Sequence, residues 1–316
     1  MKQEFRVDSF DRFIGQNKIT SILKIMISSA NEQQSMIDHI LFYGPPGLGK
    51  TSLAKIIANE FKTNIVYVQG PMIEKKSDVL TIFSSIQEND IIFIDEIHAM
   101  NKNVEELFYS AMEDFAIDIA LGVDGNKKIM RLKLKKFSLI AATTKFNLLS
   151  KPLKDRFGYI GKLQPYSNKE IEKIINQSTA ANSIKIDKES IEYIAKHSRQ
   201  TPRIANNLLK RVNDFCIYEK QKKITIDTVK SAFEYLDIYL YGLYLPQIEY
   251  LKALNKTFYN RYASLDSISS IIKDDRSSIL NEIEPLLLIY KLIEKSSRGR
   301  RITNEGIKYL EEQKLI

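Results

Sequence analysis

A glycine-rich loop constrains this sequence more than any other feature: Gly44-Pro45-Pro46-Gly47-Leu48-Gly49-Lys50-Thr51, with the spacing G-x-x-x-x-G-K-T. The apolar run Ile40–Tyr43 before it predicts a strand, and the segment Ser52–Glu60 after it has apolar residues at helical spacing. Glycines let backbone N–H groups turn inward around a phosphate, and the amino end of a helix adds its positive dipole. The strand–loop–helix context disfavours a simple Gly/Pro turn and predicts a nucleoside triphosphate site.

Polar side chains complete the predicted site. Lys50 can reach the β- and γ-phosphates, and the Thr51 hydroxyl can bind Mg²⁺. Asp95 and Glu96 end the apolar run that starts at Asp90, which predicts two carboxylates at the carboxyl end of a buried strand. We expect Asp95 to position Mg²⁺ and Glu96 to polarise the attacking water. The alternative is a pair of solvated charges. His98 could lie near the site, although a loop histidine is more often incidental.

Length and composition describe a soluble protein of more than one domain. The chain has 316 residues, 44% of them hydrophobic, and a net charge of +8, which is weak support for a polyanionic partner. Cys216 is the only cysteine, so an intrachain disulfide is excluded and a reducing compartment is expected. The amino terminus does not resemble a signal peptide, and no apolar run approaches the ~20 residues of a membrane helix. We therefore expect a cytoplasmic protein without a membrane partner.

Three organisational zones follow one another along the chain. Strand and helix patterns alternate through about residue 165, which predicts an α/β domain with a parallel sheet. Residues 166–240 are helical, with a capping box at Ser167 and Glu170. In residues 241–316 three helical stretches precede a short basic hairpin, the pattern of a winged-helix DNA-binding domain.

The α/β zone contains an insertion of about 116–137. Apolar and polar residues alternate on both sides of Asp124-Gly125, a two-residue turn signal, so the insertion predicts a β-hairpin. It precedes the core strand Ser138–Thr144. A protruding hairpin is either an arm that docks on a partner or a small sheet packed on the domain, and the residues alone do not decide between these.

Arginines in three segments suggest contacts with phosphates. Arg156, in Pro152–Gly158, follows a strand that ends in Thr143-Thr144 and can serve a neighbouring subunit, although a surface ion pair is the simpler interpretation. Arg203 lies in the first turn of a helix begun by Thr201-Pro202, where a cation opposes the dipole unless a phosphate is near. The hairpin near the carboxyl end carries basic residues that can meet DNA phosphates: Arg298, Arg300 and Arg301.

Several segments together resemble the RuvB family, bacterial ATPases of the AAA+ superfamily that drive branch migration of Holliday junctions. They are GPPGLGKTSLAKIIANE, IIFIDEIHAMNKNVEELFYSAMEDF, LIAATTK, PLKDRFG, TPRIANNLLKRVNDF and SSRGRR, in the family's order and spacing over nearly the whole chain. The resemblance implies a fold of three domains. These are a P-loop AAA+ core (1–165), a small helical lid (166–240) and a winged helix (241–316).

The resemblance also implies site residues. Catalytic roles fall on Lys50, Asp95, Glu96, Thr144 as sensor 1, Arg156 as an arginine finger acting in trans, and Arg203 as sensor 2. Nucleotide contacts with ATP or ADP fall on Arg6, Ile14, Gly44, Gly47, Leu48, Gly49, Lys50, Thr51, Ser52, Tyr166 and Arg203. Thr51 and Asp95 would hold Mg²⁺, and Arg298 and Arg300 would contact duplex DNA.

The implied partners are double-stranded DNA in the arms of a Holliday junction, five further copies of the chain in a homohexamer, and RuvA. RuvA would dock on the hairpin near Asp124-Gly125, and association with the RuvC resolvase is also implied. Four residues differ from the family pattern without removing a catalytic group: Val7, Lys145, Lys154 and Gln200. They affect the expected geometry of adenine binding and of the subunit interface.

Two other classes of protein share parts of this pattern. A clamp-loader or replication-initiator ATP switch has the same nucleotide motifs, but the inserted hairpin and the basic wing favour a DNA motor. A DNA-binding module with an inactive ATPase is disfavoured because Lys50, Asp95, Glu96 and Arg156 are all present.

Overall fold

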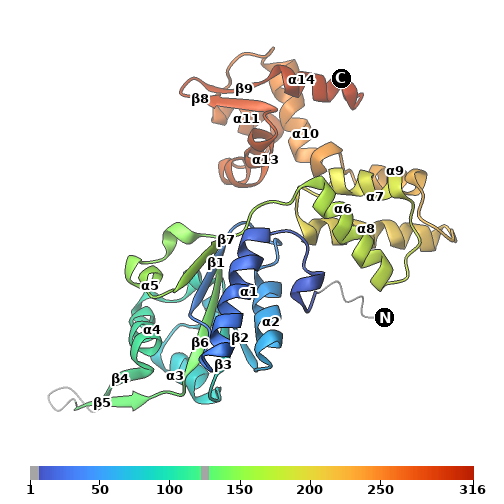
Figure 1. Ribbon diagram of the computed structural model, residues 1–316. Coiled ribbons are helices and arrows are strands. Elements are labelled where there is room, and N and C mark those ends of the chain that lie inside the picture. The colour runs from blue at the N-terminus through green and yellow to red at the C-terminus, as the bar shows by residue number, and fades with distance from the viewer. Residues whose placement is uncertain (1–6, 122–127) are drawn as a thin grey trace. The chain divides into compact units, whose positions relative to one another are not determined.

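The computed structural model describes residues 7–121 and 128–316 (Figure 1). The chain divides into two compact units. One runs through Ile174 and includes Thr201–Arg203, and the other comprises Ile175–Gln200 and Ile204–Ile316. Across the described residues, no helix combines the length and apolarity needed to cross a bilayer.

A parallel sheet of five strands forms the centre of the first unit. Its strands are β1 (Ile40–Tyr43), β2 (Ile65–Gln69), β3 (Asp90–Asp95), β6 (Phe137–Thr143) and β7 (Tyr159–Lys162), in the order β2-β3-β6-β1-β7. The register pairs Gln69 with Asp95 and Tyr43 with Thr143. The carboxyl ends of the central strands therefore meet at one edge, where ligands bind in open α/β sheets.

Helices cover both faces of this sheet, which explains why its strands read as continuous apolar runs. Figure 1 shows α1 and α2 on one face and α3 and α4 on the other. The helices are α1 (Asn17–Glu32), α2 (Lys50–Phe61), α3 (Lys76–Ser85), α4 (Lys102–Asp114) and α5 (Lys151–Asp155). Leu41 packs with α3 and α4, while its neighbours Ile40 and Phe42 point to the opposite face, and all three are fully buried. The predicted α/β class is confirmed.

Single helical turns connect several of these elements, namely Phe10–Arg12, Gly70–Met72, Ile97–Ala99 and Phe146–Leu148. The turn Ile97–Ala99 follows Glu96, which itself has a positive φ of 50°. This backbone conformation lets the chain reverse sharply at the end of β3 and places the next side chains beside the end of β6.

The insertion forms an antiparallel pair, β4 (Ala116–Leu121) with β5 (Lys128–Lys133), separate from the five-stranded sheet. The pairing sets Ile117 opposite Leu132, as the alternating pattern predicts. The insertion ends earlier than residue 137, because Phe137 is fully buried and begins β6, where it pairs with Asp90. The expected turn at Asp124-Gly125 lies outside the described residues.

Four helices follow the sheet: α6 (Asn168–Ala181), α7 (Lys188–Lys196), α8 (Pro202–Tyr218) and α9 (Ile226–Tyr235). The predicted capping box is present, because the Ser167 N–H donates to Glu170 Oε2 (2.7 Å) and the Glu170 N–H donates to Ser167 Oγ (3.3 Å). Pro202 occupies the first position of α8, where its missing N–H costs nothing.

The last part of the second unit has three helical segments, a hairpin and a terminal helix. The first segment is α10 (Leu245–Lys252), continued by a π-helical turn (Ala253–Thr257), and the second is α11 (Leu265–Ile272). The third comprises α12 (Arg276–Ser278), a π-helical turn (Ile279–Ile283) and α13 (Glu284–Ile289). Strands β8 (Ile293–Ser296) and β9 (Gly299–Ile302) form the hairpin, here called the wing, and α14 (Asn304–Glu312) follows. The predicted helices and wing are confirmed, whereas α14 was not anticipated.

Candidate functional site

The glycine-rich loop joins β1 to α2 and has a backbone that only glycine adopts easily. Gly44, Gly47 and Gly49 have φ values of 142°, 80° and 106°. A Cβ atom on Gly44 would lie 2.7 Å from the Leu163 carbonyl oxygen, so there is also no space for a side chain. The loop, which includes Leu48, therefore presents backbone N–H groups to an anion. The first turn of α2, which includes Thr51 and Ser52, adds the positive end of the helix dipole.

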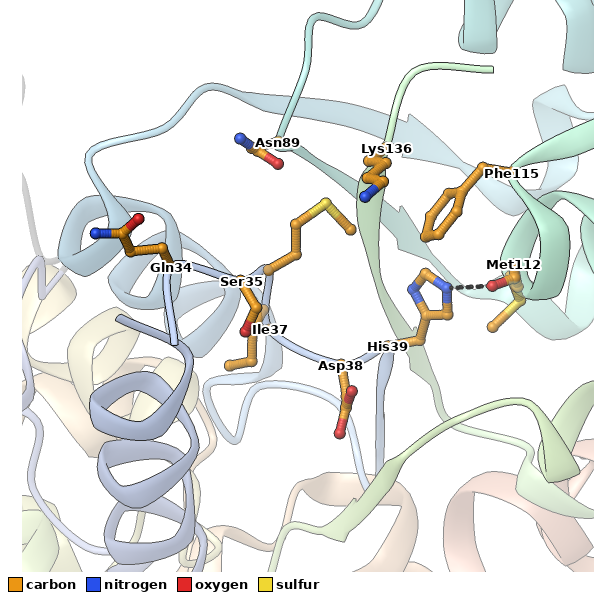
Figure 2. Close-up of a pocket in the computed structure, with 10 residues that line it drawn as sticks. Gln34, Ser35, Ile37, Asp38, His39, Asn89, Met112, Phe115 and Lys136 are labelled. Atoms are coloured by element: carbon orange, nitrogen blue, oxygen red, sulfur yellow. Dashed lines mark hydrogen bonds between the residues drawn. The ribbon is translucent and has the colours of Figure 1, made fainter. Parts of the chain in front are cut away.

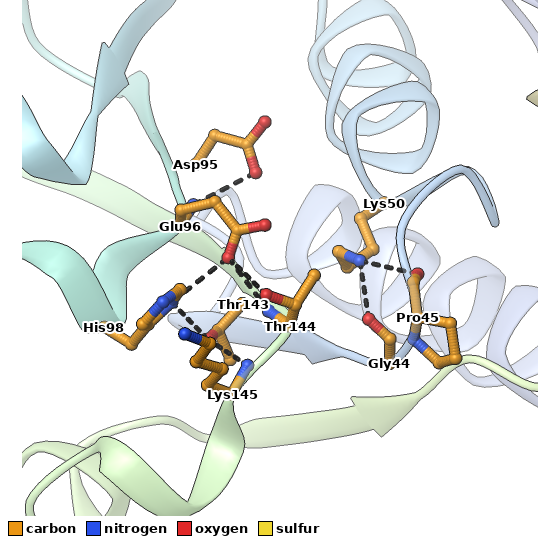
Figure 3. A network of polar contacts seen from close by, with 9 residues as sticks. All are labelled: Gly44, Pro45, Lys50, Asp95, Glu96, His98, Thr143, Thr144 and Lys145. Carbon is orange, nitrogen blue, oxygen red and sulfur yellow. Dashed lines mark hydrogen bonds and ion pairs between the residues drawn. The ribbon is translucent and has the colours of Figure 1, made fainter. Parts of the chain in front are cut away.

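Lys50 is the buried cation of this loop. Its ammonium donates to the carbonyl oxygens of Gly44 (2.8 Å) and Pro45 (2.9 Å), as Figure 3 shows. Burial lowers the pKa of Lys50, and the nearby carboxylates of Glu96 and Asp95 oppose that shift. An ammonium held at the mouth of the loop is suited to a negatively charged phosphate chain.

Asp95 and Glu96 lie at the end of β3, on the same side of the sheet as the loop. Asp95 Oδ1 accepts a hydrogen bond from the Glu96 N–H (3.0 Å), and burial raises the pKa of the Asp95 carboxyl. Within the part of the chain that the structure describes, no three His, Cys, Asp or Glu side chains gather as a metal site. Mg²⁺ at nucleotide sites takes one or two protein ligands besides phosphate oxygens, and Thr51 and Asp95 fit that donor set.

Glu96 and Thr144 are joined directly. Both the N–H and the hydroxyl of Thr144 donate to Glu96 Oε2, at 3.0 and 2.9 Å. His98 belongs to the same network, because its Nδ1 lies 3.1 Å from Glu96 Oε2 and 3.0 Å from Thr143 Oγ1 (Figure 3). Sequence reasoning missed this role for His98. The available signal was its position two residues after Glu96 in a short turn.

Thr201–Arg203 approaches the glycine loop within the first unit. The Arg203 N–H donates to the Gly47 carbonyl (3.4 Å), and a Cβ atom on Gly47 would lie 2.8 Å from Arg203 Cβ. The charge of Arg203 also contributes to the lowered pKa of Lys50. The predicted pair of basic groups around one phosphate site is thus brought together.

Other residues expected to contact the nucleotide lie around the loop as well. The Tyr166 hydroxyl donates to the Leu48 carbonyl (3.0 Å), and burial raises the pKa of Tyr166 to about 12. Gly15 packs closely on the Tyr166 ring, and Ile14 beside it is half-buried. Arg6 lies outside the described residues.

Arg156 is held by helices α4 and α5. Its guanidinium donates to the Pro152 carbonyl (2.8 Å), pairs with Glu113 (3.1 Å) and lies over the Tyr109 ring, with Cζ 4.5 Å from the ring centre. An ion pair, the simpler of the two interpretations of Arg156, is therefore present with Glu113 of α4, and the role in trans stays a prediction.

The two arginines expected on DNA differ in environment. Arg298 is exposed in the turn of the wing. Arg300 is only 12% exposed, and its Nε donates to Glu284 Oε1 (2.6 Å), which is itself buried. The Arg300 side chain therefore pairs with Glu284 of α13 and links the wing to that helix. Of the two arginines, Arg298 is the more accessible to a DNA phosphate.

One cavity of about 410 Å³ lies at the opposite edge of the sheet from the glycine loop. Its walls include His39, Asn89 and Lys136, which directly precede β1, β3 and β6 (Figure 2). His39 Nε2 donates to the Met112 carbonyl (3.0 Å) while Nδ1 accepts from the Leu139 N–H (2.8 Å). His39 thus serves the packing of the sheet, and the cavity is not part of the nucleotide site.

Comparisons with known proteins agree with this architecture over nearly the whole chain. Residues 5–163 match the RuvB P-loop domain of the Holliday junction DNA helicase, residues 166–239 the RuvB AAA lid domain, and residues 240–311 the RuvB C-terminal winged helix domain.

Two similar curated proteins carry the same name. The Holliday junction branch migration complex subunit RuvB of Mycoplasmopsis pulmonis is 52% identical over 310 residues, with 98% of each chain covered. The protein of that name from Mesomycoplasma hyopneumoniae is 51% identical over 311 residues, again with 98% of each chain covered. The solved structure of the Thermotoga maritima RuvB Holliday junction branch migration motor has a TM-score of 0.81 at 37% identity, covering 97% of this chain and 98% of that one. With family models matching its P-loop, lid and winged-helix parts in turn, the chain belongs to the RuvB family of AAA+ ATPases.

Proposed function

We propose that this protein is an ATP-driven motor that moves the branch point of Holliday junctions in DNA recombination and repair. The observation that carries the proposal is the convergence of Lys50, Asp95, Glu96 and Thr144 at one edge of the sheet, in a chain that also has a basic wing. The names of the relatives from Mycoplasmopsis pulmonis and Thermotoga maritima support the substrate.

Hydrolysis at this site uses the described side chains as follows. The loop N–H groups and Lys50 bind the phosphates of ATP, and Arg203 adds a second cation. Thr51 and Asp95 would hold Mg²⁺, which would neutralise negative charge on the phosphates when bound. Glu96 accepts the proton of the attacking water, and Thr144 keeps the Glu96 carboxylate in place. Charge that develops on the transferred phosphoryl group is thereby met by positive groups on several sides.

The active assembly we propose is a homohexameric ring in which Arg156 acts on the nucleotide of the neighbouring subunit. Arg156 directly follows α5, and its side chain lies against α4. An arginine supplied in trans stabilises transition-state charge and makes hydrolysis depend on assembly. The proposed domains are 1–165, 166–240 and 241–316.

The partners follow from two surfaces. Ile129 and Met130 on β5 are 77% and 46% exposed, which supports the hairpin as the docking arm for RuvA. Arg298 in the wing supports binding to duplex DNA. Association with RuvC, and a cytoplasmic location, accompany the same proposal.

The decisive experiment measures branch migration on a synthetic four-way junction, with ATP and Mg²⁺, in the presence and absence of RuvA. We expect strand products that require ATP and increase with RuvA. Glu96→Gln is the matched control, because it keeps the shape of the side chain but removes the base. It should bind ATP normally and lower the rate of hydrolysis by about 10²–10⁴-fold. A wild-type protein that hydrolyses ATP on DNA but leaves the junction unmoved would contradict the motor function.

A further inference from the structure

His98 Nδ1 faces two oxygen atoms at once. It lies 3.1 Å from Glu96 Oε2 and 3.0 Å from Thr143 Oγ1, and the His98 side chain is 12% exposed. Thr143 Oγ1 also accepts the Lys145 N–H (3.0 Å), so the ring is fixed against the end of β6 (Figure 3). The contacts of His98 therefore join three segments: the end of β3, the turn that follows it and the end of β6.

The chemistry of the neighbours decides which nitrogen of His98 carries the proton. An ionised carboxylate oxygen only accepts hydrogen bonds, so a lone pair on Nδ1 would repel Glu96 Oε2 at this distance. A proton on Nδ1 can be donated to Thr143 Oγ1 and also attracts the carboxylate oxygen 3.1 Å away. The described contacts thus favour the tautomer with Nδ1–H.

Two hydrogen bonds and the His98 ring then converge on one oxygen of Glu96. The Thr144 N–H and the Thr144 hydroxyl donate to Oε2, and His98 Nδ1 lies at ion-pair distance from it, 3.1 Å away. Figure 3 shows the other carboxylate oxygen on the side of Lys50. The carboxylate plane is consequently fixed, with one oxygen used for anchoring and the other directed to the phosphate side.

We propose that His98 is a positioning residue for ATP hydrolysis, holding Glu96 so that Oε1 receives the proton of the attacking water. This inference rests on the proposed function, because it assigns a task only if Glu96 is the base. A glutamate has three rotatable side-chain bonds, and a displacement of about 1 Å at a reacting group can cost about 10²-fold in rate. Thr144 and His98 approach Oε2 from different segments, so each restricts a motion that the other leaves open.

The test compares three substitutions of His98 in the full-length protein. His98→Asn places an amide nitrogen where Nδ1 lies, whereas His98→Gln places it where Nε2 lies, and neither side chain carries a charge. We therefore measure steady-state ATP hydrolysis of His98→Phe, His98→Asn and His98→Gln, together with nucleotide affinity by titration with a fluorescent ATP analogue. Thermal unfolding of each variant reports on the fold.

We expect His98→Phe and His98→Gln to lower kcat by about 10–100-fold, with KM and nucleotide affinity within about twofold of the wild type. His98→Asn should recover most of the lost kcat. Adding His98→Phe to Glu96→Gln should cause little further loss, because both act through the same carboxylate.

Two results would overturn the inference: an unchanged kcat in folded His98→Phe, or equal activities for His98→Asn and His98→Gln. Failure of the proposed function has a different signature. In that case the wild-type protein itself would not hydrolyse ATP, or Glu96→Gln would hydrolyse it at the wild-type rate.

Discussion

The Arg156 guanidinium lies over the ring of Tyr109, with Cζ 4.5 Å from the ring centre, and pairs with Glu113 one helical turn farther along α4. The Tyr109 hydroxyl donates to Glu105 Oε1 (2.7 Å), so the ring itself is fixed. Helix α4 begins three residues after the turn that contains His98. One rigid helix therefore connects the neighbourhood of Glu96 in one site with the arginine that we propose acts in the next.

The trans role of Arg156 predicts complementation between inactive subunits. Arg156→Ala removes the finger and Lys50→Ala removes the phosphate contact, and each variant alone should lose about 10³-fold or more in ATP hydrolysis. A mixed ring contains some interfaces with an intact loop facing an intact finger. We therefore expect partial recovery of ATPase activity on mixing the two variants. Absence of recovery in rings shown by native mass spectrometry to be mixed would refute the trans assignment.

The contact between Arg156 and the Tyr109 ring predicts that two substitutions of Tyr109 lower ATP hydrolysis to different extents. Tyr109→Phe keeps the ring beneath the guanidinium, so its ATPase rate should stay within about threefold of wild type. Tyr109→Leu removes the aromatic face, a contact worth about 1 kcal/mol or more when shielded from water. We expect its assembly-dependent ATPase rate to fall about 10-fold, with unchanged nucleotide affinity. Equal rates for the two variants would show that the ring does not orient Arg156.

Gly70, which directly follows β2, has no catalytic group, yet we expect its substitution to lower both stability and ATP hydrolysis. A Cβ atom there would lie 2.3 Å from the Glu96 carbonyl oxygen and 2.9 Å from its carbonyl carbon. Because these are backbone atoms, Gly70→Ala must displace the turn that carries Glu96. We expect a loss of about 1–3 kcal/mol in the free energy of unfolding and a reduced kcat.

Gly161→Ala is the matched control for that substitution. Its Cβ would approach ring atoms of Phe42 and Tyr159 at 3.2 Å, so it strains the same sheet without touching Glu96. Its kcat should remain near the wild-type value. If both variants lose kcat in proportion to their stability, Gly70 has no specific link to the site.

The features that sequence predicted well are those encoded locally. The loop Gly44–Thr51 is set by glycine and by its flanking strand and helix, and Asp95 and Glu96 followed from a rule about strand ends. His98 and Arg300 could not be placed in this way. The partner of His98 in β6 is Thr143, 45 residues away, and the partner of Arg300 is the buried Glu284 in α13. Neither contact has a periodic signal, because both depend on packing between separate elements.

His197 predicts a pH-dependent stability of the helical part of the second unit. It is buried, stacks on Tyr193 and has its pKa lowered to about 4, chiefly by burial. Below about pH 6.5 the unfolded chain takes up a proton that the folded protein cannot accept until about pH 4. The contribution of His197 to stability is therefore complete above about pH 6.5 and falls by roughly 3 kcal/mol as the pH approaches about 4.

His197→Phe isolates this effect, because all other titrating groups are common to both proteins. Denaturant unfolding across this pH range should give a shallower loss of stability for the variant than for the wild type. The two curves need not coincide at neutral pH, since the hydrogen bond from His197 to the Tyr193 carbonyl is also lost. Parallel curves would contradict the lowered pKa.

Two arginines of the wing, which the sequence did not distinguish, are predicted to differ: one substitution affects DNA binding and the other affects stability. Arg298→Ala should weaken duplex binding and lower the slope of log affinity against log salt by about one, with an unchanged unfolding temperature. Arg300→Ala should instead destabilise the wing by up to about 3 kcal/mol, because Glu284 is 1% exposed and, among the described residues, would keep Lys295 (3.3 Å) as its one cationic partner.

Fluorescence anisotropy of labelled duplex DNA at several salt concentrations, combined with thermal unfolding, separates these two outcomes. The double variant Glu284→Leu with Arg300→Met supplies the control, because it removes the buried charge together with its partner. It should recover most of the stability lost in Arg300→Ala and keep the wild-type salt slope, since Arg298 still meets the phosphate. A salt slope reduced by about one in this stable double variant would restore Arg300 as a DNA contact, and would require its guanidinium to leave Glu284 when the wing binds.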